Sequence, residues 1–326
     1  MPGVITPSSS SNPILQGVLD LSVAGMEGFI GDQVFPAMGV NLQSSVFKRR
    51  AAPEINKKPE LSKRANGMEA VSDETRFTED TYSTNWYGRK RVITDRERDD
   101  YVGKFGIDLY DVTRRDMLWQ VAAMYEALVA AATFNTTTLP LSGTTGHTVS
   151  AAWSSTSTSL PVDDVNTAKA GIEARSGGLQ ANIVVIDSMA TARALVMSDQ
   201  VRTSLGLSQN DATNLSSSMT AQKLAAIFDV QNVVIANAWG VNGYQPSGSL
   251  AALWTSGYAF VGYVDRSPNP LAMSFGRSLY WNRKGGQFYG TEYREDKLEA
   301  QIFEVNTDVD VKVFNSACGY LIDIVP

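Results

Sequence analysis

Two stretches of sequence decide the fold: VNLQSSVFKRR over residues 40–50 and TRFTEDTYSTNWY over residues 75–87. The first alternates apolar and polar side chains and the second is rich in threonine and aromatic residues, which is typical of β-strands. The segment between them, residues 48–74, holds few aliphatic side chains. Because such a tip buries too little apolar surface to offset its ordering entropy, we expect a long arm that projects from the subunit body and contacts another molecule.

Basic residues are concentrated in this arm. Residues 48–104 carry 14 of the 28 Lys and Arg side chains, against 11 Asp and Glu. Residues 48–64 alone carry seven basic and two acidic side chains, a local charge of +5 in a chain with a net charge of −6. The seven basic residues are Lys48, Arg49, Arg50, Lys57, Lys58, Lys63 and Arg64.

This charge pattern has three interpretations. The first is a solvated, charged hairpin, and the second is a patch for nucleic acid. Acidic residues are interleaved throughout, which argues against the second. The third is an arm that meets acidic surface on identical copies of the chain. We favour the third and expect the seven basic residues to contact neighbouring subunits.

Composition excludes several classes of protein. With 326 residues and 43% hydrophobic side chains, the chain can hold one large domain or two ordinary ones. Its single cysteine, Cys318, excludes an intrachain disulfide and fits a reducing compartment. The N-terminal residues lack the basic and apolar regions of a signal peptide, and the apolar runs are shorter than the ~20 residues that span a bilayer. We therefore expect a soluble, intracellularly made protein with no membrane partner.

The strongest helix signal follows the arm. Apolar residues recur at helical spacing from residue 107 to residue 134, with no proline or glycine between them. The spacing predicts one continuous helix from Ile107 to at least Val129, longer than an average helix. The residues expected to face the subunit body are Leu118, Val121, Tyr125 and Leu128. Such a helix would act as a spine for an elongated subunit.

The remaining sequence predicts a mixture of helices and strands. We expect a loop over residues 135–162, helices over 165–175, 190–205 and 221–228, and buried strands over 183–186 and 233–236. From residue 250 the pattern favours β-structure, with a hairpin turn over 281–286 and a last strand over 320–325. The predicted class is α+β: an extended arm, a spine helix and a mixed sheet with flanking helices.

Signals for catalysis are weak. His147, the single histidine, lies in the predicted 135–162 loop, where we interpret it as an ordinary loop residue. A nucleophilic pair of His147 with Cys318 is formally conceivable, but no basic neighbour in the sequence would lower the pKa of the thiol. One histidine and one cysteine do not make a zinc site. We predict no catalytic residue, no cofactor and no metal site.

A cluster of acidic residues follows the arm. The carboxylates of Asp95, Glu97, Asp99 and Asp100 are interleaved with basic residues 96 and 98. Such alternation favours a self-neutralising charged segment over a site for a hard cation.

Three segments resemble the major capsid proteins of tailed bacteriophages. The string FIGDQVFP over 29–36, followed by VNLQS over 40–44, resembles the entry to their extended loop. RANGMEA over 64–70, which is followed by Tyr82, Tyr87, Ile93 and Asp95 and then the long helix, is similar to the return of that loop. LAAIFDVQNVVI over 224–235 is similar to a helix–strand unit of the family. The order of arm, spine and sheet covers roughly residues 25–326.

This resemblance implies a Hong Kong 97-type capsid fold with an N-terminal arm, an extended E-loop hairpin, a long spine helix and a mixed β-sheet axial domain. The implied domains are an N-terminal arm (1–40), the E-loop (41–95), a peripheral domain with the spine helix (96–180), the axial domain (181–300) and C-terminal strands that return to the body (301–326).

The implied function is structural. The subunit would self-assemble into the icosahedral or prolate shell that encloses the genome of a tailed phage, made in the host bacterial cytoplasm and placed in the virion capsid. Its partners would be identical subunits in hexamers and pentamers, separate scaffolding, portal and decoration proteins, and packaged double-stranded DNA held without sequence specificity. The alternative within the same fold is an encapsulin-like bacterial compartment shell, and a distant alternative is a carboxylate-dependent hydrolase.

Overall fold

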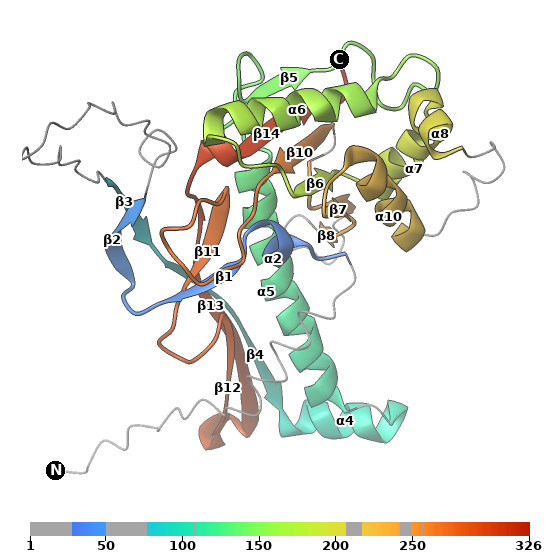
Figure 1. The fold of residues 1–326 in the computed structure, drawn as a ribbon. Coiled ribbons are helices and arrows are strands. Elements are labelled where there is room, and N and C mark those ends of the chain that lie inside the picture. Colours follow the sequence, from blue (N-terminus) through green and yellow to red (C-terminus); the bar gives the residue numbers. More distant parts are fainter. Residues whose placement is uncertain (1–27, 50–76, 107, 207–216, 242–248, 256) are drawn as a thin grey trace, which may run out of the picture.

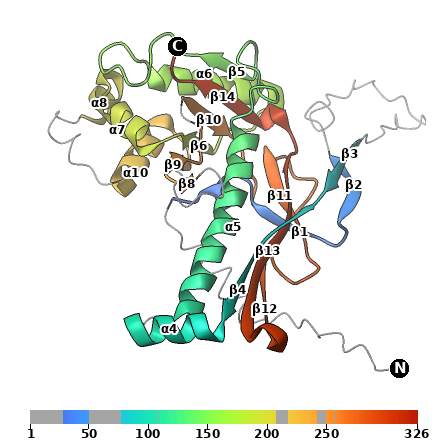
Figure 2. The ribbon, with the colours of Figure 1, turned by 180° about the vertical axis from the view of Figure 1, so that it is seen from behind.

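The computed structural model describes residues 28–49, 77–106, 108–206, 217–241, 249–255 and 257–326. In this part of the chain, two five-stranded sheets lie at different heights along one long helix (Figure 1). A group of helices covers the upper sheet on one flank of the molecule. A two-stranded hairpin leaves the body on the opposite flank, as the view from behind also shows (Figure 2).

The long helix is α5 (Leu109–Thr133), a single helix of 25 residues, ~38 Å at the standard rise. The predicted spine is therefore confirmed, but it begins later than expected. The helix starts after Asp108 because the carboxylate of Asp108 accepts the N–H of Tyr110 and caps it. Residue 107 lies outside the described residues. Of the four residues predicted to face the body, Leu118, Val121 and Tyr125 are buried and Leu128 is half-buried against the same core.

A short helix that the sequence did not predict precedes the spine. This helix, α4 (Asp95–Phe105), contains the four acidic residues of the charged segment. The hydroxyl of Thr94 accepts the N–H of Glu97, and Gly106 ends the helix with a left-handed φ of 64°. None of its residues is buried, and the side chains that it packs on the described body, those of Asp95, Glu97 and Arg98, are half-buried.

The lower sheet contains the longest strand. Its strands are, in order, β1 (Ala37–Val40), β11 (Gly276–Trp281), β13 (Ala300–Val313) and β12 (Phe288–Glu295), with β4 (Asn85–Thr94) also paired to β13. The β1–β11 pair is parallel and the others are antiparallel. The spine α5 packs against β13 and β4, where Val305, Thr307 and Val309 are buried. The hairpin predicted around residues 281–286 is wrong. Strands β11 and β12 do not pair with each other; both pair antiparallel with β13, β11 with residues 309–313 and β12 with residues 300–307.

The upper sheet has the order β5 (Gly146–Thr148), β14 (Gly319–Asp323), β10 (Tyr258–Gly262), β6 (Ile183–Ile186) and β7 (Asn232–Ile235). The aliphatic runs predicted as buried strands form β6 and β7, which pair in parallel. Helices α6 (Pro161–Ser176), α7 (Met189–Met197), α8 (Asp199–Leu205) and α10 (Ser217–Phe228) pack on it around a second hydrophobic core. A small antiparallel pair, β8 (Trp239–Val241) and β9 (Leu250–Ala252), lies beside it.

The helix predicted over 190–205 is two helices, because the chain leaves helical geometry at Ser198. The side chain of Ser198 is fully buried and accepts a hydrogen bond from the hydroxyl of Ser159. The next N–H, of Asp199, is donated to the carbonyl of Thr156 at 2.8 Å instead of within a helix. Contacts with the preceding loop therefore break the helix at a point that local propensity does not mark.

The two predicted arm strands form an antiparallel hairpin, β2 (Ser44–Arg49) and β3 (Thr78–Ser83), in a register that pairs residue 44 with residue 83 and residue 49 with residue 78. The chain enters the hairpin from β1 after a single helical turn, α2 (Gly31–Val34). The tip, on which the prediction of a projecting arm rested, lies mostly outside the described residues. Among the described helices, none combines the length and apolarity that crossing a membrane needs.

Candidate functional site

The structure places two of the predicted contact residues at the base of the arm. Of the seven, it describes Lys48 and Arg49, at the far end of β2. The other five, Arg50, Lys57, Lys58, Lys63 and Arg64, lie outside the described residues.

The two described basic residues have different environments. Lys48 is exposed, and its Nζ lies 5.9 Å from the centre of the Phe77 ring, a weak cation–π contact. Arg49 is half-buried and donates from Nη1 to the carbonyl of Phe314 at 2.8 Å. Lys48 is therefore available to another molecule, whereas Arg49 fastens the hairpin to its own body.

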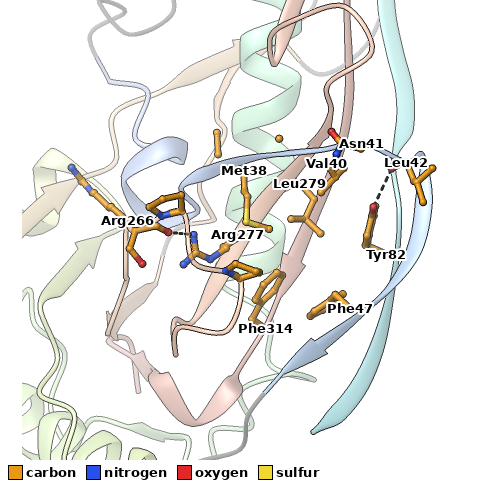
Figure 3. Close-up of a pocket in the computed structure, with 15 residues that line it drawn as sticks. Met38, Val40, Asn41, Leu42, Phe47, Tyr82, Arg266, Arg277, Leu279 and Phe314 are labelled. Atoms are coloured by element: carbon orange, nitrogen blue, oxygen red, sulfur yellow. Dashed lines mark hydrogen bonds between the residues drawn. The ribbon is translucent and has the colours of Figure 1, made fainter.

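An apolar groove runs along the base of the hairpin. It has a volume of about 560 Å³ and lies between β1, the hairpin and the 266–270 loop (Figure 3). Phe47 of β2 stacks on Phe314 with ring centres 4.5 Å apart, and Tyr82 of β3 donates its hydroxyl to the carbonyl of Leu42. Leu42 itself is 59% exposed at the rim. The groove presents apolar surface next to the arm, as surfaces that contact other proteins do.

Arg277 shapes the far wall of this groove. Its side chain is 1% exposed, and its two terminal nitrogens donate to the carbonyls of Ser267 and Asn269 at 2.6 and 3.1 Å. Asp265 lies 3.9 Å away, and burial lowers the pKa of the guanidinium. Arg277 therefore holds the 266–270 loop in place from beneath it. Arg266, on the same loop, is exposed at the rim.

A buried carboxylate fastens the segment that leads into the arm. Glu126 of α5 is 1% exposed, and it accepts the N–H groups of Ile30 and Gly31 and the indole N–H of Trp254, each at 2.8 Å. Burial raises the pKa of Glu126, and these three donors oppose the rise. The sequence analysis did not single out Glu126; a charged residue within the largely apolar stretch 121–134 could have signalled a buried contact, but nothing in the sequence identifies its partners.

The neighbouring residue on the spine makes a second contact with the same segment. Tyr125 donates its hydroxyl to Asp32 Oδ1 at 2.9 Å and lies 2.8 Å from the hydroxyl of Ser278. Burial raises the pKa of Asp32, while the Tyr125 hydrogen bond and the charge of Arg266 oppose the rise. Helix α2 is thus held to the spine by two adjacent side chains, Tyr125 and Glu126.

The prediction for His147 needs correction. The residue lies in strand β5, not in an ordinary loop. Its Nδ1 is 3.2 Å from the hydroxyl of Tyr320, and its Nε2 is 3.4 Å from Asp164 Oδ1. The other oxygen of Asp164 accepts the indole N–H of Trp153 at 2.8 Å. Strand pairing with β14 and these contacts give His147 a structural position between β5, β14 and α6.

Cys318 is fully buried, and burial raises the pKa of its thiol to about 12. A thiol with that pKa is protonated at neutral pH and is a poor nucleophile. Among the described residues, no group of three or more His, Cys, Asp and Glu side chains is placed to hold a metal ion.

The four carboxylates of α4 are paired with basic side chains. Asp95 binds Arg294 at 2.6 Å, Glu97 lies 3.8 Å from Arg91, and Asp99 and Asp100 pair with neighbours on the helix. This arrangement agrees with the self-neutralising interpretation of the segment. The same helix exposes three apolar side chains, Tyr101, Val102 and Phe105.

Comparisons with known proteins bear on what this architecture is. No family model and no curated protein matches the sequence. Among solved structures, the chain is similar to a phage-related protein from Bordetella bronchiseptica, with a TM-score of 0.70 and 20% identity over 97% of this chain and 98% of that one. It is also similar to the capsid of cyanophage P-SCSP1u (TM-score 0.56, 11% identity, 89% and 86%) and to the mature capsid of bacteriophage PhiM1 (TM-score 0.53, 11% identity, 99% and 91%).

These matches extend over almost the whole chain and over almost the whole of their counterparts, so the likeness is one of complete architecture. The chain has the α+β fold of tailed-phage major capsid proteins, with the extended hairpin and the long spine helix that the sequence predicted. The expected fold class is confirmed.

Proposed function

We propose that this protein is the structural subunit of a shell that encloses the genome of a tailed bacteriophage. The observation that carries the proposal is the likeness in fold to two phage capsid structures over most of the chain, at identities of only 11%. Because so few residues are identical, what the chain shares with these proteins is the arrangement of its helices and strands. Because a fold can host many functions, the exposed features of this chain have to support the assignment.

Those features are surfaces that a single copy leaves open. The groove beside the hairpin and the apolar face of α4 both expose apolar side chains, and the hairpin leaves the body on one flank (Figure 1). Surfaces of this kind favour association with further copies. The proposed role is structural, and we assign no catalytic residue, cofactor or metal.

The proposed domains keep the expected boundaries. Residues 1–40 would form the N-terminal arm, 41–95 the E-loop, 96–180 the peripheral domain, 181–300 the axial domain and 301–326 the C-terminal strands. Lys48 and the five basic residues that follow Arg49 in the arm would contact neighbouring subunits. Arg49 would fix the base of the arm, because the carbonyl of Phe314 already accepts its Nη1 hydrogen bond.

The proposed partners are identical subunits in hexamers and pentamers, together with separate scaffolding, portal and decoration proteins. Packaged double-stranded DNA would meet the inner surface without sequence specificity. The subunit would be made in the host bacterial cytoplasm and would end in the virion capsid.

Electron microscopy of the purified protein tests the proposal. We expect closed shells of uniform size, and in lysates from phage-producing cells we expect nuclease-protected DNA within them. Shells that never contain nucleic acid would favour the encapsulin-like compartment. A protein that stays monomeric across concentration and ionic strength would refute a shell subunit of either kind.

A further inference from the structure

One face of the spine helix is covered over its upper half and open over its lower half. The helical repeat places residues 112, 115, 116, 119, 123 and 126 of α5 on this face. At its upper end, Ala123 and Glu126 are buried. At its lower end, Val112 is 42% exposed, Trp119 is 38% exposed, and Arg115 between them is also exposed. In this lower half, β4 and β13 pack on the other side of α5 (Figures 1 and 2).

The chain that leads into the arm covers this face in order. The N–H groups of Ile30 and Gly31 are donated to Glu126. The ring of Phe29 lies edge-on against that of Trp119, two turns nearer the start of the helix, with ring centres 6.0 Å apart. The contacts therefore move toward the start of α5 as they move toward the start of the chain. This order indicates a direction for the residues that come before Gly28.

Those preceding residues lie outside the described residues, but their sequence is rich in apolar side chains. The stretch 14–26, ILQGVLDLSVAGM, holds eight apolar side chains and one charged side chain. Burial of such side chains is favourable by about 25 cal/mol for each Å² of apolar surface removed from water. The stretch therefore favours a position against apolar surface over one in water.

The open face of the spine is within reach of this stretch. Val112 lies two helical turns beyond Trp119, a distance of ~10.5 Å along the axis. An extended chain covers that distance in about three or four residues. Because Gly28 adjoins Phe29, whose ring already contacts Trp119, the preceding residues start next to the open face.

We propose that residues 14–26 dock on the open face of the spine of their own copy, against Trp119 and Val112. They would extend the contact that Phe29 begins. Attachment at Gly28 supplies the stretch to this face at an effective concentration of about millimolar, which no separate copy matches in dilute solution. The spine would then be packed on both sides in a single subunit, and the N-terminal arm would take its direction from the helix before any neighbour binds.

Labelling of an introduced cysteine tests the proposal in the unassembled, full-length chain. Val112→Cys places a thiol on the open face, and the native Cys318 is buried. A companion chain has the apolar residues of the stretch replaced by serine at positions 15, 18, 19, 21, 23 and 26. We expect the serine replacements to speed labelling at position 112 about tenfold or more, because they remove the cover. Comparing the same thiol in two chains cancels its intrinsic reactivity.

The matched control is Ala170→Cys, at an exposed position in the middle of α6. Its labelling rate should be the same with and without the serine replacements. Arg115→Cys, one turn further along the open face, is a second probe should Val112→Cys fail to fold, and it should respond in the same direction.

Two results would overturn the inference. One is an equal labelling rate at position 112 in the two chains, which would mean that this face is open to water. The other is protection that increases with subunit concentration, which would assign the cover to a second copy. Neither measurement needs a shell, so a failure of this inference and a failure of the proposed function can be told apart.

Discussion

Replacing Glu126 by glutamine tests whether the buried carboxylate holds the entry of the arm to the spine. In the parent, Oε1 accepts the N–H groups of Ile30 and Trp254, and Oε2 accepts that of Gly31. The amide of Glu126→Gln can keep the first two bonds. Its NH₂ group then faces the N–H of Gly31, which leaves one buried donor without an acceptor. The expected loss in the free energy of unfolding is about 1–3 kcal/mol.

Removing the side chain is expected to cost more. Glu126→Ala leaves all three buried donors unpaired and opens a cavity against the spine, so we expect a loss of at least about 3 kcal/mol. Urea unfolding of the unassembled subunit, followed by tryptophan fluorescence and circular dichroism, measures both variants. Trp254 is a direct probe because its indole N–H is one of the three donors. Glu173→Gln, at an exposed position of α6, is the control and should change stability by less than about 0.5 kcal/mol.

One outcome would refute this reasoning. Burial raises the pKa of Glu126, so its charge is itself unfavourable in the folded state. If Glu126→Gln were more stable than the parent, the cost of burying the charge would outweigh the hydrogen bond from the N–H of Gly31 that the amide loses. The carboxylate would then not be what stabilises the entry of the arm.

Three further predictions concern other parts of the chain. Arg49→Ala should lower the stability of the hairpin base by about 1–3 kcal/mol, because the carbonyl of Phe314 loses its charged donor, whereas Lys48→Ala should leave the stability of the unassembled subunit unchanged. Amide hydrogen exchange in β2 and β3 would show the difference, and equal exchange in the two variants would contradict it. Burial raises the pKa of the Cys318 thiol to about 12, so the thiol is protonated at pH 8, and a thiol reagent should label it only after the protein unfolds. Rapid labelling of the folded protein would contradict this. Arg277→Met should make the 266–270 loop more sensitive to proteases, because two loop carbonyls lose their donors, and an unchanged cleavage rate would show that the loop is held by other contacts.

Local patterns were sufficient where packing and propensity agree. Helical spacing over 107–134 predicted the spine, and the aliphatic runs at 183–186 and 233–236 predicted two buried strands, which the structure places side by side in the upper sheet. Helix α4 was missed because its residues are charged and none is buried. Thr94 followed three residues later by Glu97 is nevertheless a recognised signal for a helix start, and it was present in the sequence.

The contacts at the candidate site could not be predicted from one sequence. Arg49 binds a carbonyl 265 residues away, and Glu126 binds N–H groups 96 and 95 residues away. Neither pairing leaves a periodic trace, because each depends on where the finished sheets place the two segments. The sequence therefore predicted the arm as a region of contact, which stays a prediction, and it did not single out Arg49 as a residue that anchors the base of the arm.

The anchors bear on how the arm would function in assembly. At its base, Phe47 stacks on Phe314, Asp80 pairs with Lys312 at 3.3 Å, and Asp310 accepts the N–H of Ser83. These contacts fix the direction of the hairpin within one copy, before any neighbour is present. Association is opposed by the entropy of ordering whatever is mobile, so an arm whose base is already oriented loses less on binding than one that is free throughout. Loosening the base should therefore weaken assembly even where every residue that touches the neighbour is unchanged.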